Sequence, residues 1–164
     1  FFRAMDILVP MLEKEGIKLS LEAHPEDWVE EIHPAIEIIK TINSPMVRAS
    51  FIAPHTFFYG PDMEANLRAT QGLLEHVRLA DTYDHNKSSE LRYIVNPPES
   101  KVRVHQHLDF GQGEIDWDLF FATLADMKFD GVLSNCVFAW EDRAEDSARF
   151  MLDQTKQYLK KHFK

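Results

Sequence analysis

The chain has 164 residues, of which 45% are hydrophobic and 27% are charged, as is typical of a soluble globular domain with its own core. Its formal net charge of −9 argues against nucleic-acid binding. No apolar run approaches the roughly 20 residues that a membrane span needs. The single cysteine, Cys136, excludes an internal disulfide. We therefore expect a cytoplasmic protein that binds neither nucleic acid nor membranes.

Hydrophobic periodicity predicts helices and strands that alternate along the chain. Pro10 is expected to kink the first helix, and Gly16 to end it. A long loop is expected over 82–101, followed by a short strand that carries His105 and His107. The predicted helices cover residues 1–15, 28–42, 62–74, 117–128 and 142–162, and the other predicted strands cover 17–21, 46–52, 75–80 and 131–137.

This alternation predicts an α/β fold with a parallel sheet and right-handed crossovers. No glycine-rich dinucleotide motif follows the first strand, which disfavours a dinucleotide-binding fold. Four β/α units are half of a TIM (β/α)8 barrel. Since the chain starts at Phe1 rather than at a methionine, we expect a piece of a longer polypeptide. Either a missing N-terminal half or a partner in a homo-oligomer would cover the edges of the sheet.

A histidine pair is the most distinctive feature of the sequence. His105 and His107 alternate along a short extended stretch, so their imidazoles are expected to point to the same side. Gly111 and Gly113 follow as a turn, and Asp116 is a plausible N-cap of the next helix. Such a pair fits two nitrogen ligands of one metal ion. The alternative is two surface histidines near a loop.

Ligand-type residues also stand where other predicted strands end. Glu22 and His24 follow the first strand, His55 the second and Asp81 the third. In parallel α/β folds the chemistry lies beyond these carboxyl ends. Imidazoles with a carboxylate suit a divalent ion such as Zn, Mn, Fe or Co, which could polarise a carbonyl or lower the pKa of a bound water.

Each of these residues also has a structural alternative. Glu22 could pair with a basic neighbour such as Arg48, and His24, which precedes a proline, could merely shape the turn. Asp81 could cap a helix or turn.

Two further residues are candidates for substrate contact. Phe57 belongs to an aromatic run that could cover the mouth of the barrel or stack on a substrate. Arg92 lies in the long loop and could bind an anionic or hydroxylated substrate, because loops of this length are often lids.

Several motifs resemble the sugar phosphate isomerase/epimerase superfamily of xylose isomerase-like TIM barrels, and within it the IolH type of myo-inositol catabolism protein. The motifs are Glu22-Ala-His-Pro25, Pro54-His-Thr-Phe-Phe-Tyr59, His76-Val-Arg-Leu-Ala-Asp-Thr82, Arg92-Tyr-Ile-Val-Asn-Pro-Pro98 and His105-Gln-His107 with Gly111-Gln-Gly-Glu114. The resemblance implies that residues 1–164 form the C-terminal half of the barrel. It also implies a metal-dependent isomerase, epimerase or related lyase that acts on a sugar or polyol in inositol or carbohydrate catabolism.

The usual metal site of this family has Glu, Asp, His and Glu on four successive strands. Only the first carries over, to Glu22. The second and third positions fall on Ile52 and Arg78, and the fourth falls on Cys136 or a near neighbour. None of these three can serve as the family's metal ligand. This loss supports an alternative function, a sugar-binding barrel relative without catalysis.

A different branch, that of endonuclease IV, has a further metal position that looks like His55, His105 and His107 here. The resemblance thus implies one metal ion held by these three histidines. Glu22 or Asp81 would be near enough to act as ligand or base. His24 and Arg92 would position hydroxyl groups of the substrate.

Overall fold

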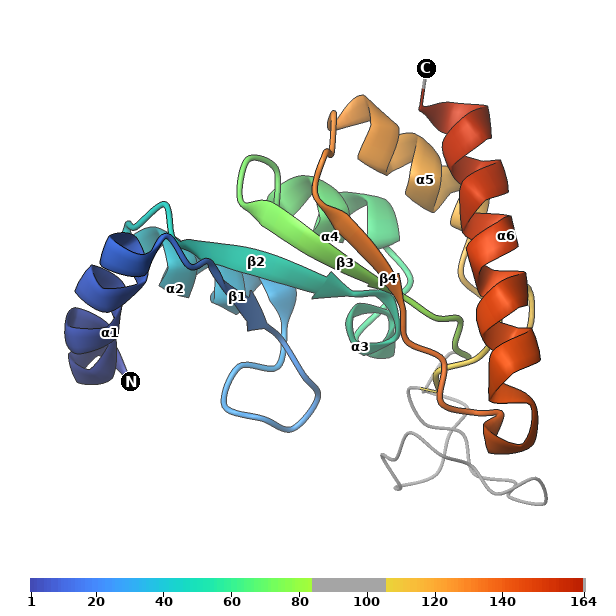
Figure 1. Ribbon diagram of the computed structural model, residues 1–164, viewed down its shortest axis with the longest axis horizontal. Helices are drawn as coiled ribbons and strands as arrows, with labels where there is room; N and C mark the ends of the chain where they lie inside the picture. The colour runs from blue at the N-terminus through green and yellow to red at the C-terminus, as the bar shows by residue number, and fades with distance from the viewer. Residues whose placement is uncertain (84–105, 164) are drawn as a thin grey trace.

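The computed structural model describes residues 1–83 and 106–163. Helices and strands alternate along this part of the chain, as predicted (Figure 1). The elements are α1 (Phe2–Glu15), β1 (Leu19–Glu22), α2 (Ile32–Ile42), β2 (Val47–Ile52), α3 (Ala53–Phe58), α4 (Met63–Ala69), β3 (Leu74–Leu79), α5 (Trp117–Asp126), β4 (Val132–Asn135), the 3-10 turn η2 (Glu141–Arg143) and α6 (Ala144–His162). In the described ranges, no helix is long and apolar enough to cross a membrane.

The four strands form one parallel sheet in the order β1-β2-β3-β4. Strand order equals chain order, so each helical crossover leads to the neighbouring strand. Helices α1 and α6 lie at opposite ends of the curved arrangement (Figure 1). The carboxyl ends of all four strands therefore share one edge of the sheet, where ligand-type residues were expected to meet.

The two faces of the sheet differ in polarity. Val47, Ala49 and Phe51 alternate along β2 and belong to the main apolar cluster, which also takes in side chains of all six α-helices. The intervening residues, such as Arg48 and Ser50, face the other way, because side chains alternate along a strand. We call this second side the inner face; by the same alternation it carries Ser20, Glu22, Ile52, His76, Arg78, Ser134 and Cys136.

Local chemistry explains where the predicted helix boundaries hold and fail. Gly16 has φ 65° and ends α1 as predicted, while the helix continues through Pro10. The predicted helix over 28–42 begins only at Ile32. Pro34 then falls in the first turn, where its missing N–H costs no helical hydrogen bond, and Trp28 lies outside the helix and is 65% exposed.

The expected strand that carries His105 and His107 is wrong over its described residues, Gln106 and His107. Gln106 and His107 belong to no strand, and Leu108 forms only an isolated antiparallel bridge with Asp81. A short helix that was not predicted, α3, follows β2 directly. His105 and the long loop that contains Arg92 lie outside the described residues.

Candidate functional site

Two of the predicted metal ligands come together at the carboxyl edge of the sheet. Nε2 of His107 lies 3.3 Å from Nε2 of His55. The side chains are buried, at 2% and 4% exposure. His55 stands in α3, directly after β2, whereas His107 belongs to the segment that bridges to the end of β3. Fifty-two residues of chain separate the two rings, so their meeting is a product of the fold.

Backbone carbonyls set the tautomers of both rings. Nδ1 of His107 lies 2.7 Å from the carbonyl oxygen of Cys136, and Nδ1 of His55 lies 3.3 Å from that of Ala23. A carbonyl oxygen only accepts hydrogen bonds, so each Nδ1 carries a proton. In the neutral rings each Nε2 then presents a lone pair, and the two lone pairs are directed at a shared space.

Burial keeps His107 neutral. It lowers the pKa of His107 to about 4, against the opposing effect of the hydrogen bond to Cys136. Phe138, just after β4, covers the imidazole with its own ring, at a centroid distance of 4.6 Å. The backbone oxygen of His107 accepts hydrogen bonds from the N–H groups of Phe138 and Ala139, so the main chain at this residue is fixed as well.

The two imidazoles fit two ligands of one first-row metal ion. Nitrogens that each lie about 2.0–2.1 Å from a tetrahedral zinc ion are about 3.3 Å apart, which equals the separation of the two Nε2 atoms. Among the residues that the structure describes, no three His, Cys, Asp or Glu side chains form a cluster that could hold a metal. The third predicted histidine ligand, His105, lies in the undescribed stretch.

Cys136 is not placed to add a thiolate. Its Sγ lies 3.4 Å from Nδ1 of His107, on the far side of the ring from Nε2. Burial raises the pKa of this thiol to about 12, so it stays protonated. Its contribution to the site is the carbonyl oxygen that orients His107.

Glu22 lies beside His55, the other histidine of the pair. Its Oε1 lies 3.4 Å from Nδ1 of His55, and its Oε2 accepts a 2.8 Å hydrogen bond from Nη1 of Arg78. Burial raises the pKa of the Glu22 carboxyl, although Arg78 acts in the opposite direction. The structural alternative, in which Glu22 pairs with a basic neighbour, is therefore confirmed, although the partner is Arg78 and not Arg48, whose guanidinium donates to the carbonyl oxygen of Gly72.

Asp81 has a structural task at the end of β3. Its carboxylate accepts hydrogen bonds from the backbone N–H groups of Thr82, Gly111 and Ile115, at 2.9, 2.8 and 3.2 Å, and the residue is 1% exposed. This matches the turn-capping alternative. Through these bonds Asp81 holds the turn that follows His107.

The predicted substrate-contacting residues differ in their surroundings. The ring of His24 lies 4.4 Å from that of His55, and its Nδ1 is 2.8 Å from the carbonyl oxygen of Pro25. Phe57 is 5% exposed and packs in the main apolar cluster, and its contact with a substrate stays a prediction. Arg92 lies outside the described residues.

The sequence did not predict two side chains that contact the candidate site residues, Arg78 and Phe138. Arg78 pairs with Glu22 across β2, and both stand on the inner face, so strand alternation could have brought them together. Phe138, in the segment after β4, packs on the ring of His107 in a tilted arrangement. No periodicity signals that contact, since it depends on how this loop returns over the sheet.

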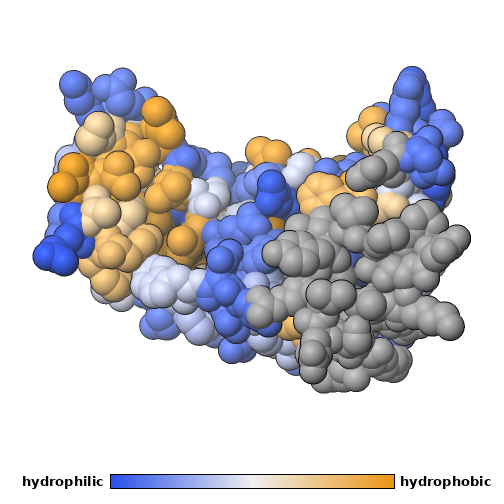
Figure 2. Space-filling model, turned by 90° about the horizontal axis from the view of Figure 1, so that it is seen from below, coloured by the Kyte–Doolittle hydropathy of each residue, from blue (hydrophilic) through white to orange (hydrophobic). Residues whose placement is uncertain are grey.

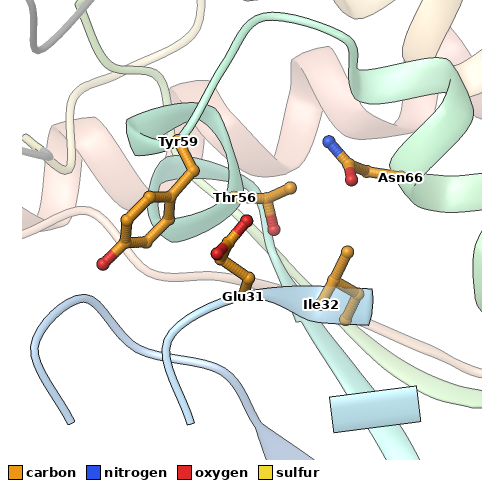
Figure 3. A pocket seen from close by; sticks show the side chains of 5 residues that line it. All are labelled: Glu31, Ile32, Thr56, Tyr59 and Asn66. Atoms are coloured by element: carbon orange, nitrogen blue, oxygen red, sulfur yellow. The ribbon is translucent and has the colours of Figure 1, made fainter. Parts of the chain in front are cut away.

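A separate small pocket lies between the start of α2 and the helices after β2. It has a volume of about 80 Å³ and is lined by Glu31, Ile32, Thr56, Tyr59 and Asn66 (Figure 3). Ligand pockets usually measure about 300–1,000 Å³, so this one suits a few water molecules better than a sugar. The histidine pair remains the candidate site.

The sequence of this chain is similar to a known protein family and to a characterised relative. The family profile described as xylose isomerase-like TIM barrel matches residues 1–154. The inosose isomerase of Bacillus licheniformis is 27% identical to this chain over 162 residues, which cover 96% of the chain and 54% of that protein.

Solved structures give the same fold. A D-tagatose 3-epimerase-like protein is similar with a TM-score of 0.71 at 22% identity, over 97% of this chain and 53% of the other. The IOLI protein, whose crystal structure has a binding zinc atom, is similar with a TM-score of 0.72 at 24% identity, over 97% and 56%. The chain thus spans about half the length of each relative.

Proposed function

We propose, from the premise that this chain belongs to the xylose isomerase-like TIM barrel family, that it is a metal-dependent isomerase or epimerase, or a related lyase, of a sugar or polyol. Its four parallel strands make up about half of such a barrel. The similar inosose isomerase supports a substrate from inositol or carbohydrate breakdown, whereas the resemblance to the IolH type stays a prediction. A cytoplasmic location belongs to the same proposal.

One observation carries this proposal: Nε2 of His55 and Nε2 of His107 face each other at 3.3 Å, with both Nδ1 atoms engaged by backbone carbonyls. We infer that Zn, Mn, Fe or Co is held by these two histidines together with His105. Such an ion would polarise a carbonyl and lower the pKa of an adjacent C–H or O–H group.

In this proposal Glu22 is the general base that takes the proton from the C–H or O–H group of the substrate. Its carboxyl pKa is raised by burial, which brings it closer to the range of an effective general base. Arg78 holds one carboxylate oxygen and leaves Oε1 on the side of the histidines. Glu22 is a better candidate than Asp81, whose oxygens are engaged by three backbone N–H groups. His24 and Arg92 would bind substrate hydroxyls.

Glu22 is also a candidate ligand of the ion, but its present contacts favour a supporting role. Its Oε1 faces Nδ1 of His55, the nitrogen opposite the one that would bind metal. Carboxylates in this position fix the tautomer and orientation of a ligating histidine. The same side chain could therefore orient His55 and exchange a proton with the substrate.

A second function is favoured by a specific feature of the inner face. Glu22 forms an ion pair with Arg78, one of the positions at which the family motif would place a metal ligand. A barrel that had lost its metal could keep such a pair and bind a sugar without catalysis. Metal binding separates the two functions.

The test measures the metal content of untagged protein purified without chelator, for wild type, His107→Ala and His33→Ala. His33 is exposed on α2 and serves as the matched control. We expect metal in wild type and His33→Ala, and at least a tenfold loss in His107→Ala with an unchanged far-UV circular dichroism spectrum. Saturating Zn or Mn should also stabilise wild type by about 2.7 kcal/mol at 100 times Kd. Metal-free wild type without this gain would support the sugar-binding alternative.

A further inference from the structure

Arg78 places a permanent positive charge beside the candidate site. Its Nη1 donates a 2.8 Å hydrogen bond to Oε2 of Glu22, and Oε1 of the same carboxylate lies 3.4 Å from Nδ1 of His55. The Glu22 carboxylate thus has the guanidinium at one oxygen and the histidine pair at the other.

Most donors of the Arg78 guanidinium are left for a ligand. A guanidinium has five N–H donors, and among the residues that the structure describes the single hydrogen-bond and ion-pair partner of Arg78 is Glu22. The side chain is 40% exposed. The N–H groups on Nε and Nη2, which Glu22 does not use, are therefore open to a group that binds on the inner face.

The neighbours of Arg78 along the inner face are neutral, apart from Glu22. In the register of the sheet, Ile52 of β2 and Ser134 of β4 lie opposite Arg78. His76, two residues earlier on β3, has its Nε2 2.7 Å from Oγ of Ser134. Burial and the charge of Arg78 both lower the pKa of His76, so this ring is neutral at pH 7. At these three positions no carboxylate competes for the unused N–H groups.

Two further cations on this side of the sheet already have partners. Nζ of Lys18 lies 2.7 Å from Oε1 of Glu75, whose Oε2 is 3.8 Å from Nε of Arg48, and Nη2 of Arg48 donates to a backbone carbonyl. With Arg78, these make three cations that share two carboxylates, Glu75 and Glu22, although the chain as a whole has a net charge of −9. This local excess of positive charge favours an anionic ligand over a cationic one.

The side of the molecule on which the loop after β1 lies presents polar surface. This loop is on the lower side in Figure 1. Seen from below, hydrophilic surface lies between the apolar surface at the α1 end and the residues drawn in grey (Figure 2). Such surface suits a ligand with several hydroxyl groups, but it does not by itself select a charge. The preference for an anion comes from Arg78.

We propose that Arg78 binds a carboxylate group of the substrate, so that the sugar or polyol on which this site acts is a sugar acid. This inference rests on the proposed function, because it gives Arg78 a place in the same site. A planar guanidinium binds a planar carboxylate through two parallel N–H···O hydrogen bonds. The edge formed by Nε and Nη2 can make both of them while Nη1 stays on Glu22.

One positive charge and one free edge favour a carboxylate over a phosphate. A phosphate group brings up to two negative charges and three acceptor oxygens, whereas Arg78 offers a single charge that already pairs with Glu22. A carboxylate adds only one negative charge next to that side chain, and two hydrogen bonds engage both of its oxygens. A carboxylate bound in this way would hold the adjoining carbon atoms of the substrate beside Glu22, the proposed general base.

The experiment measures the binding of three matched probes by NMR chemical-shift titration at pH 7.5 in chelator. The probes are glycerate, glycerol and glycerol 3-phosphate, which share a three-carbon skeleton and differ in the charged group. We expect glycerate to bind at least tenfold more tightly than glycerol, and more tightly than glycerol 3-phosphate. Arg78→Gln should weaken glycerate binding at least tenfold. Arg78→Lys keeps the charge without the planar edge, so its affinity should fall between those of Arg78→Gln and wild type.

Arg48→Gln is the matched control, because it removes the same charge from the same face. Arg48 stands four residues before Ile52, the register partner of Arg78, and is thus about 13 Å away along the strand. Glycerate binding should be unchanged in this variant. Glu22→Gln should instead tighten glycerate binding at least threefold, since it removes the carboxylate that repels the probe. A loss of structure in Arg78→Gln would not produce that gain.

Three outcomes would overturn the proposal. Glycerate could bind no more tightly than glycerol, glycerol 3-phosphate could bind more tightly than glycerate, or Arg48→Gln could weaken glycerate binding as much as Arg78→Gln does. Far-UV circular dichroism checks the fold of each variant. Binding is read out without metal or turnover, so its failure is distinct from a failure of the metal test of the proposed function.

Discussion

His107 combines three roles in one side chain. Its Nδ1 donates to the carbonyl of Cys136, its Nε2 faces His55, and its ring packs against that of Phe138. Each contact takes the imidazole further from water, and desolvation disfavours the charged form. The burial that leaves Nε2 available as an electron-pair donor must therefore also make the fold sensitive to acid.

The metal-free protein should lose stability as the pH falls below about 6.5. An unfolded histidine has a pKa near 6.5, whereas burial lowers that of folded His107 to about 4. Between these values the unfolded state binds more protons, so acid favours unfolding, by on the order of 3 kcal/mol over the full window. Urea midpoints at pH 7.5 and 5 in chelator measure this loss. His107→Gln should show a smaller loss and His33→Gln the same loss as wild type; equal losses in all three would contradict the assignment.

The turn after His107 contains two glycines, Gly111 and Gly113, whose surroundings differ. A Cβ on Gly113 would lie 2.3 Å from Oδ1 of Asp81 and 2.3 Å from the carbonyl oxygen of Thr82. At Gly111, with φ 82°, a Cβ would meet nothing within 4 Å, so only the left-handed backbone disfavours a side chain there, by about 1–2 kcal/mol.

Gly113→Ala should therefore destabilise the protein more than Gly111→Ala does. The first must displace the Asp81 cap, with its three backbone hydrogen bonds, and we expect a loss of about 3 kcal/mol or more. Urea unfolding gives both values. Metal content should also fall in Gly113→Ala, because the turn holds His107. A smaller loss for Gly113→Ala than for Gly111→Ala would show that the turn can relax around the added methyl group.

At the level of elements, the sequence predicted the four strands and their parallel order, because runs such as 46–52 combine buried alternation with clear turn signals. It missed α3, whose six residues are too few for helical periodicity to register. It also extended α2 back to Trp28, whose apolar side chain is exposed. The strand-end rule placed His55 at the carboxyl edge of the sheet, but His107 belongs to no strand. Its contact with His55, like the packing of Phe138 on its ring, depends on tertiary structure that no local pattern encodes.

The whole molecule keeps its apolar core on the helix side of the sheet and its charges on the inner face. One cluster of buried side chains runs from Met5 in α1 to Met151 in α6. The inner face carries ion pairs such as Glu22 with Arg78 that tolerate water. The four β/α units can therefore hold a core of their own, with β1 and β4 as the outer strands of the sheet in the part of the chain that the structure describes.

The chain should accordingly unfold in one cooperative transition. Phe120 of α5 and Phe51 of β2 are fully buried and pack with their ring centroids 5.9 Å apart, so Phe120→Ala should cost about 3–5 kcal/mol. Phe150 is 41% exposed on α6, and Phe150→Ala should cost less than about 1 kcal/mol. Tryptophan fluorescence and far-UV circular dichroism, followed through urea unfolding, should give the same midpoint. Separate midpoints in wild type would mean that the core of these four β/α units does not unfold as a single body.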